Sequence, residues 1–454
     1  MTNEEIVALI TTEVEQFFCK DVSAWGMEDL ENDTRELVTR VGQAIFQHQL
    51  ERRVEASQRG YRGPRLEVGD GRVAHFERYE VRELRSYFGL VALERAYYWI
   101  PGDGRREQIA PLDGELGLNE HEATPALQKG LEALGVEVPF TRAERLLQEL
   151  TRVQVSARTI AEVTEDAGGR LRAEKQPRVE EAWGVFEGPS CAKAKQGLGT
   201  VAGDLGKWST VEGPARLYIQ MDGGRVNTEE GWREPKVAVL FRQQDVAAVS
   251  KDRHELVRKE YVGTMEGIEQ FMKHVWEAGL RWGAHQAKEI IVLGDGAECF
   301  QRRAEELYPE AVQILDWYHA SEHLWEVARA LYGAESAEAA KWAEPRIDKL
   351  RAGGVGEVLA ELRQLRPRRR EVAQKVAELI GYYESNRQRM KYDEFESKGY
   401  FIGSGSVESG VKNVVNMRMK GCGMKWNVDR ADRMIHARAA RLSTFEYPTK
   451  KLAA

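Results

Sequence analysis

The sequence predicts an α/β protein: an α/β core with a helical insertion, preceded by a mostly helical N-terminal region that contains a small β-rich subdomain. Three observations predict this class. Short strand-type apolar runs alternate with helical spacing over residues 215–334, as in a sheet flanked by helices. Residues 335–400 are helical and heavily charged, and residues 401–454 complete the core with a C-terminal helix and a basic tail. The chain of 454 residues also exceeds what one core usually supports, so several structural units are expected.

The N-terminal region covers residues 1–188. Apolar residues recur at helical spacing over residues 6–17 and 30–46, which predicts amphipathic helix as a lead-in. From residue 60 to about 118 the pattern changes to short stretches such as Leu90–Ile100. These stretches predict the β-rich subdomain.

A second helical block follows the β-rich subdomain. Thr141 can cap a helix over residues 142–151, and Ser156 can cap another over residues 157–166. Two helices with a tight connection, at about residues 141–166, have the form of a DNA-binding helix-turn-helix. Two packed helices of an ordinary α-domain would have the same pattern, so both interpretations stay open.

Residues 189–214 are rich in Gly, Ser, Ala and Lys, and we expect them to form a linker. The α/β core begins after this linker. Residues 217–221 and 236–242 are strand-like and could pair as a hairpin. The alternation then continues through a helix over residues 264–282, a strand over 290–293, a helix over 297–307 and a strand over 312–315.

Three carboxylates stand where these elements end or begin. Asp222 and Asp295 each follow a strand, and Glu408 opens a helical stretch. Taken singly, the aspartates could be turn residues and Glu408 an ordinary first-turn glutamate. However, ligand sites in α/β sheets form where strands end. Together the three could hold a pair of Mg²⁺ ions, or Mn²⁺, because these cations prefer oxygen ligands.

A second cluster follows the last predicted strand. It contains Asp316, His319 and His323, and the two histidines would lie one helical turn apart. That spacing permits a zinc site. The order His319-Ala-Ser-Glu322-His323 nevertheless lacks a glutamate directly after the first histidine, as zinc proteases require. We favour either a histidine that supports the carboxylate centre or a structural pair of histidines with satisfied hydrogen bonds.

The C-terminal segment is locally basic, although the net charge of the chain is -7. An acidic total argues against a protein that coats nucleic acid non-specifically. A basic face directly after Glu408 would instead meet a phosphate backbone beside the metals, and an aromatic ring there could stack on a base. A solvated amphipathic helix with a core tryptophan is the alternative. The candidate DNA-binding residues are Lys412, Arg418, Lys420, Lys425 and Trp426.

Composition excludes several classes. No apolar run approaches the roughly 18 residues of a membrane helix, so we expect no membrane contact. The acidic N-terminus lacks the order of a secretory signal, which favours a cytoplasmic protein. The four cysteines form no CxxC pair, so neither a disulfide framework nor a zinc knuckle is expected. Phosphate-cradling GxxxxGK[ST] and serine-hydrolase GxSxG motifs are also missing from the sequence.

On these residues the chain resembles the DDE transposases of bacterial insertion sequences, most closely the Kra type, which is distantly akin to the Mutator-like group. Relatives usually carry paired cysteines around the Tyr97-Tyr98 motif. Here Trp99-Ile-Pro-Gly stands instead, so that metal site is expected to be lost. The matching segments are Met221-Asp222-Gly223, Leu293-Gly-Asp295-Gly-Ala297, Ile314-Leu-Asp316-Trp-Tyr-His319, Gly403-Ser-Gly-Ser-Val-Glu408-Ser, Arg418-Met-Lys420 and Gly423-Met-Lys-Trp426.

The resemblance implies a ribonuclease-H-like catalytic core in which Asp222, Asp295 and Glu408 bind two metal ions. It also implies that Asp316 and His319 are an accessory element. The implied reaction is DNA transposition: hydrolytic nicking at the ends of a mobile element, then attack of a 3′-hydroxyl on target DNA. Transposon ends and target DNA are the expected partners, and pairing two ends requires a homo-oligomer.

Two other functions stay open on the sequence. One is a non-catalytic DNA-binding protein derived from a transposase, whose N-terminal helices still recognise DNA. The other is a zinc hydrolase centred on His319 and His323. The intact set of three carboxylates favours the enzyme over both.

Overall fold

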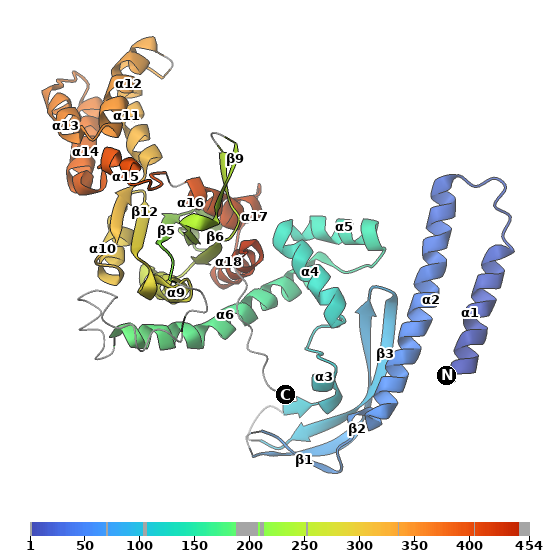
Figure 1. Ribbon diagram of the computed structural model, residues 1–454. Coiled ribbons are helices and arrows are strands. Elements are labelled where there is room, and N and C mark those ends of the chain that lie inside the picture. The colour runs from blue at the N-terminus through green and yellow to red at the C-terminus, as the bar shows by residue number, and fades with distance from the viewer. Residues whose placement is uncertain are drawn as a thin grey trace. The chain divides into compact units, whose positions relative to one another are not determined.

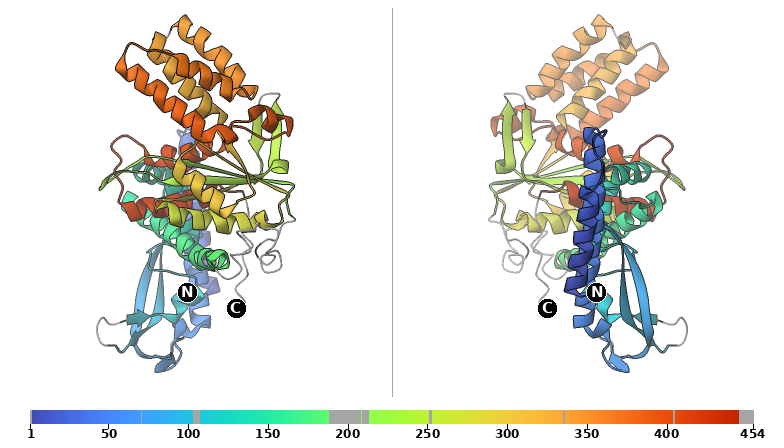
Figure 2. Two further views of the ribbon diagram at one scale, coloured as in Figure 1. Left: turned by 90° about the vertical axis from the view of Figure 1, so that its left-hand side faces the viewer. Right: turned by 90° about the vertical axis from the view of Figure 1, so that its right-hand side faces the viewer.

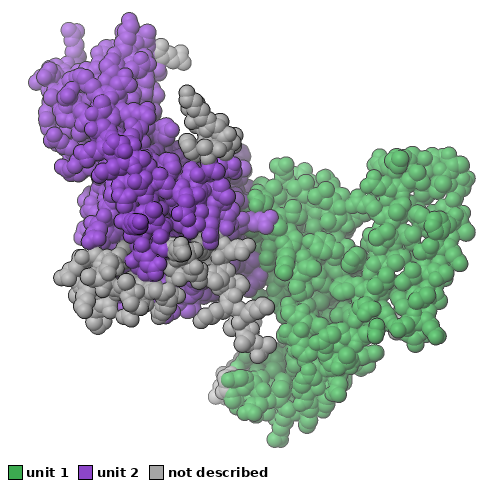
Figure 3. Space-filling model, viewed as in Figure 1, with its two compact units in different colours: residues 1–164 green, residues 165–454 purple. Residues whose placement is uncertain are grey.

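The computed structural model describes residues 2–69, 71–102, 107–187, 208, 213–250, 253–334, 336–403 and 405–444. The fold is mixed α/β with several sheets. The chain divides into two compact units, Met1–Thr164 and Glu165–Ala454, which Figure 3 colours separately. The division falls inside one helix, α6 (Ala157–Glu187). Most of the predicted linker, residues 189–214, lies outside the described residues.

Unit 1 begins with two helices and a sheet, as predicted. A hydrogen bond from Gln47 Nε2 to the Ala92 carbonyl, at 2.9 Å, and one from the Ala92 amide to Gln47 Oε1 tie the second helix to the sheet. The strands are all antiparallel, in the order β1-β2-β3-β4. The elements, labelled in Figure 1, are α1 (Asn3–Phe18), α2 (Met27–Ala56), β1 (Arg65–Glu67), β2 (Val73–Ser86), β3 (Gly89–Ile100) and β4 (Glu107–Ile109).

Unit 1 ends with α3 (Pro111–Glu115), α4 (Pro125–Glu137), α5 (Phe140–Thr151) and the start of α6. Leu127, Leu147 and Ile160 share one buried core. The predicted cap at Ser156 is confirmed, because its Oγ accepts a hydrogen bond from the Thr159 amide at 3.2 Å. The prediction for Thr141 was wrong, since α5 already begins at Phe140 after Pro139.

Unit 2 is built on a five-stranded sheet in the order β11-β8-β5-β12-β13. β5 and β8 form the predicted antiparallel hairpin, and β11 pairs antiparallel with β8. β12 and β13 run parallel to β5. The strands are β5 (Arg216–Gly223), β8 (Lys236–Arg242), β11 (Glu260–Thr264), β12 (Glu289–Gly294) and β13 (Val312–Leu315). Two small hairpins, which the sequence did not predict, are β6 (Val226–Thr228) with β7 (Gly231–Arg233) and β9 (Val246–Ser250) with β10 (Arg253–Leu256).

Helices cover both faces of this sheet. Successive side chains of a strand point to opposite faces. Leu217, Ile219 and Met221 of β5 therefore share a core with α9 (Ile268–Arg281) and α10 (Glu298–Leu307). The alternate residues of β5 face the other layer, where the amide of Val407 donates a 3.2 Å hydrogen bond to Gln220 Oε1. That layer consists of α16 (Gly405–Gly410), the π-helical turn η7 (Val411–Asn416), α17 (Met417–Met419) and α18 (Val428–Leu442).

A helical insertion separates β13 from α16, as the charged helical pattern predicted. Figure 2 shows it in orange as a bundle beside the sheet. The hydroxyl of Tyr383 donates to the Ala320 carbonyl at 2.7 Å, and that of Tyr392 to the Leu315 carbonyl at 3.1 Å. Among the described residues no helix is long and apolar enough to cross a membrane. The helices are α11 (Trp317–Tyr332), α12 (Ala337–Arg351), α13 (Val355–Gln364), α14 (Arg370–Asn386) and α15 (Tyr392–Ser397).

Candidate metal centre

Three aspartates form a row at one edge of the sheet. Met221 of β5 is the register partner of Gly294 in β12, and Gly294 is the partner of Leu315 in β13. The next residue on each of these parallel strands is an aspartate: Asp222, Asp295 and Asp316. Asp316 is tied into the row by a 2.8 Å hydrogen bond from its amide to the Gly294 carbonyl. The strand order therefore gathers three carboxylates that are far apart in the sequence.

The charge of Asp222 is affected by several neighbours. Burial is the main cause that raises the pKa of Asp222 from 3.8 to about 6. The nearby carboxylates of Asp295 and Glu408 raise it further, whereas a 2.7 Å hydrogen bond from the Gly223 amide and the charge of His319 lower it. The three acids singled out from the sequence thus act on one another through space, with Glu408 supplied by α16.

His319 completes the cluster as a cation. Asp316 is fully buried and caps α11, and its Oδ2 accepts hydrogen bonds from both the amide and the ring Nδ1 of His319, each at 2.8 Å. This hydrogen bond is the main cause that raises the pKa of His319 to about 9, and Asp295 and Asp222 add to the rise. Without a bound cation the imidazole therefore carries a proton at neutral pH. Ligand atoms of Asp316, His319 and Glu408 all lie within 4.8 Å of one another.

The turn after β12 holds Asp295 in place. Its Oδ1 accepts a hydrogen bond from the Ala297 amide at 2.9 Å. Gly296 has a φ of +89°, and a Cβ there would lie 2.8 Å from Leu315 Cδ1 and 2.9 Å from Tyr382 Cε2. The Tyr382 hydroxyl also donates to the Asp295 carbonyl at 2.6 Å. Sequence reasoning missed Tyr382, because only the tertiary fold brings α14 to this turn.

The donor set suits a hard divalent cation. Four carboxylates surround one region, and the raised pKa of Asp222 reflects repulsion and burial that a cation would relieve. Zinc at the histidine pair is not supported. The ligand group at this edge of the sheet contains His319 but not His323, whose Nδ1 lies 3.3 Å from Glu326 Oε2 instead.

The basic segment divides into exposed and buried parts. Lys412, Lys420 and Lys425 are exposed and remain available to a phosphate backbone. Arg418 is only 1% exposed and Trp426 only 7%. The Arg418 guanidinium lies 5.3 Å from the centre of the Trp426 ring, and burial lowers the pKa of Arg418 to about 10.

Trp426 is a structural residue of the C-terminal layer. Its ring nitrogen donates to the Met419 carbonyl at 3.3 Å, and its amide donates to the Asn227 carbonyl at 3.0 Å. The burial contradicts direct DNA contact by Arg418 and base stacking by Trp426. The alternative of a core tryptophan is the correct one for Trp426, whereas neither interpretation of the sequence predicted a buried Arg418. The spacing of the cations along this segment fits either the exposed or the buried face of a helix. The sequence therefore could not show which of these cations are exposed.

The sequence matches no protein-family model and no curated protein. A functional assignment therefore depends on the geometry of the acid cluster.

Proposed function

We propose that this protein is a DDE-type DNA transposase. In this proposal Asp222, Asp295 and Glu408 hold Mg²⁺, or Mn²⁺, and the enzyme cleaves DNA at transposon ends and joins a 3′-hydroxyl to target DNA. The observation that carries the proposal is that these acids come together from distant segments: Asp222 and Asp295 follow paired positions of neighbouring parallel strands, and the carboxylates of Asp295 and Glu408 both raise the pKa of Asp222. Glu408 also offers a ligand atom within 4.8 Å of those of Asp316 and His319. Bound cations would activate the attacking oxygen and stabilise the leaving oxygen.

The topology supports a ribonuclease-H-like core. The first three strands of the sheet, β5, β8 and β11, form an antiparallel meander, and β12 and β13 add parallel strands on the far side of β5. The acids then occupy the first strand, the end of the fourth strand and a helix that follows an insertion. That is the arrangement expected from the resemblance.

Asp316 and His319 fit an accessory role. Asp316 accepts a hydrogen bond from His319 Nδ1 and so keeps the imidazole protonated and oriented. A protonated imidazole beside the metal ligands can bind a non-bridging phosphate oxygen. It can also hold a proton for the leaving group.

The exposed lysines supply the DNA-binding component of the proposal. Lys412 lies in the π-helical turn that follows Glu408, Lys420 directly follows α17, and Lys425 lies in the next loop. Each contact between a lysine and a phosphate releases counterions, so affinity should fall with salt. Two transposon ends held together would require at least two copies of the chain.

Strand transfer with Mg²⁺ on DNA that bears the element's ends tests the proposal. The ends are found as inverted repeats in the DNA that flanks the reading frame. Asp222→Ala, Asp295→Ala and Glu408→Ala should each abolish nicking and joining, because each removes a metal ligand. Glu338→Ala is the matched control, since Glu338 lies on α12 and is fully exposed. Full activity in all three variants would overturn the metal site.

The same assay distinguishes the proposed transposase from the main alternative. A non-catalytic DNA-binding protein would bind end DNA specifically, and the wild-type protein would neither nick nor join it. In that case the three alanine variants would bind as the wild type does.

A further inference from the structure

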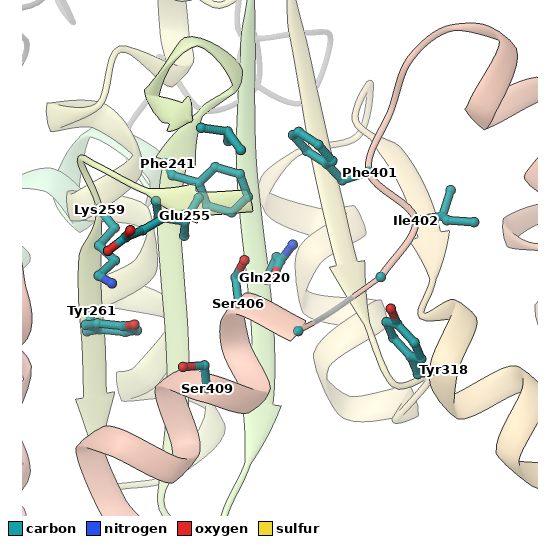
Figure 4. Close-up of a pocket in the computed structure, with 14 residues that line it drawn as sticks. Gln220, Phe241, Glu255, Lys259, Tyr261, Tyr318, Phe401, Ile402, Ser406 and Ser409 are labelled. Atoms are coloured by element: carbon teal, nitrogen blue, oxygen red, sulfur yellow. The ribbon is translucent and has the colours of Figure 1, made fainter. Parts of the chain in front are cut away.

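We propose that the cavity beside the acid cluster binds an unpaired nucleobase of the DNA strand that the enzyme processes. This inference rests on the proposed function and adds to it a site for one base. Figure 4 shows the cavity, which has a volume of about 580 Å³. Pockets that hold small organic ligands span roughly 300–1,000 Å³. The residues that matter for the argument are Gln220, Phe241, Lys259, Tyr318, Phe401 and Ser406.

The cavity and the acid cluster are built on the same three elements. Gln220 lies two residues before Asp222 on β5, so both side chains point to the same face of the sheet. On α11, Tyr318 directly precedes His319. On α16, Ser406 lies two residues before Glu408. A nucleotide whose phosphate reached the acids would therefore have its neighbouring base within reach of the cavity.

Aromatic rings form the walls. Tyr318 is 60% exposed, so its ring is open to a ligand. Its ring lies against the backbone of Gly403, where a Cβ would come within 2.7 Å of Tyr318 Cε2. Phe401 is held by Tyr218, with ring centres 5.2 Å apart, and Tyr218 stacks in turn on Phe241 at 5.0 Å. Rings held in this way suit a flat ligand.

A buried amide forms the floor. Gln220 is only 1% exposed, and its Oε1 accepts a hydrogen bond from the Val407 amide. In Figure 4 its nitrogen points toward the side of the cavity where Phe401 and Tyr318 lie. Among the described residues this nitrogen has no acceptor. Gln220 lines the cavity, so this donor is open to a ligand there, and the ring nitrogens and carbonyls of a base are suitable acceptors.

The charges favour a neutral ring over a phosphate in this cavity. Lys259 and Glu255 both line it, and Lys259 Nζ lies 5.5 Å from the centre of the Tyr261 ring. A carboxylate beside the cavity would repel an anion. Stacking on aromatic rings is open to every base, so the site would accept bases of any sequence.

Binding of a short single-stranded DNA with one central 2-aminopurine tests this site. The full-length protein is used with Ca²⁺ in place of Mg²⁺ to prevent cleavage. We expect the wild-type protein to quench the 2-aminopurine emission by stacking. Tyr318→Ala should reduce the quenching and weaken binding about 5- to 100-fold, as expected for loss of one base–aromatic stack. Tyr318→Phe should retain both, because it keeps the ring.

Tyr332→Ala is the matched control, because Tyr332 is an exposed tyrosine at the other end of the same helix. Equal quenching and equal affinity in Tyr318→Ala and Tyr332→Ala would overturn the base site, as would no quenching by the wild-type protein. Mn²⁺ binding, followed by electron paramagnetic resonance, separates the two proposals. Metal-dependent cleavage without quenching that depends on Tyr318 would leave the proposed function standing and remove the base site. Quenching that depends on Tyr318, without Mn²⁺ binding or cleavage, would leave the base site standing and remove the proposed metal-dependent function.

Discussion

Asp222→Asn is predicted to stabilise the metal-free protein while it removes metal binding. Folding disfavours the negative charge of Asp222, because this side chain becomes largely buried and lies near Asp295 and Glu408. Asparagine has nearly the same shape and keeps an oxygen that can accept the 2.7 Å hydrogen bond from the Gly223 amide. The substitution therefore removes mainly the unfavourable charge.

The magnitude follows from the pKa of Asp222, which burial and the neighbouring acids raise from 3.8 to about 6. A displacement of this size corresponds to about 3 kcal/mol at pH 7. Between pH 3.8 and about pH 6 the carboxyl group of Asp222 keeps its proton in the folded state and releases it in the unfolded state. Stability therefore falls as pH rises through this range. The advantage of Asp222→Asn should thus be full above about pH 6 and disappear below about pH 3.8.

Urea unfolding in EDTA and in Mg²⁺ measures both effects. In EDTA at pH 7 we expect Asp222→Asn to be about 1–3 kcal/mol more stable than the wild type. Mg²⁺ at a hundred times its dissociation constant should stabilise the wild type by about 2.7 kcal/mol and the variant by much less. Asp245→Asn is the control. It breaks a 2.7 Å ion pair with Arg242 and should be destabilising. An Asp222→Asn protein that is no more stable in EDTA, or that gains equally from Mg²⁺, would refute the reasoning.

Three further changes have predictable results. Arg281→Met should destabilise the protein by about 3–5 kcal/mol in urea unfolding, because it removes the guanidinium that pairs with fully buried Glu260. Adding Glu260→Gln should recover part of that loss, and no recovery would contradict the charge argument. His274 should contribute a loss of stability below pH 6.5, opposite in sign to the contribution of Asp222, since burial lowers the pKa of His274 to about 3 and the unfolded chain takes up its proton first. His274→Gln should flatten this pH dependence of the urea midpoint, and an unchanged slope would exclude His274 as its source. Gly296→Ala should cost about 1–3 kcal/mol, because of its φ of +89° and the close contact with Leu315, and it should weaken Mn²⁺ binding by displacing Asp295. Unaltered Mn²⁺ affinity would show that this turn does not position the carboxylate.

Local patterns in the sequence predict much of unit 2. The strands over residues 236–242 and 312–315 are predicted with the bounds that the structure has. β12 is predicted to within one residue at each end, because a continuous apolar run of strand length is a strong local signal. β11 is missed because its buried residues include Glu260 and Thr264, and only the partners in the fold make these polar groups acceptable in the core.

The length of α6 shows the limit of local rules. The sequence predicts a helix over residues 157–166, yet α6 runs to Glu187 and includes Gly168 and Gly169. A Cβ at Gly168 would lie 2.0 Å from the Arg433 carbonyl oxygen. The glycine allows α18 to approach this helix closely, so its role is contact and not termination.

The candidate site divides in the same way. The sequence by itself determined which acids stand at strand ends, because the period of a strand and the turn residues after it are local properties. Only the tertiary structure decided that Asp316 joins Asp222 and Asp295 in one row, that Tyr382 supports this row, and that Arg418 and Trp426 are buried. The physical reason is that strand order and burial depend on contacts between segments far apart in the chain, which no local periodicity records.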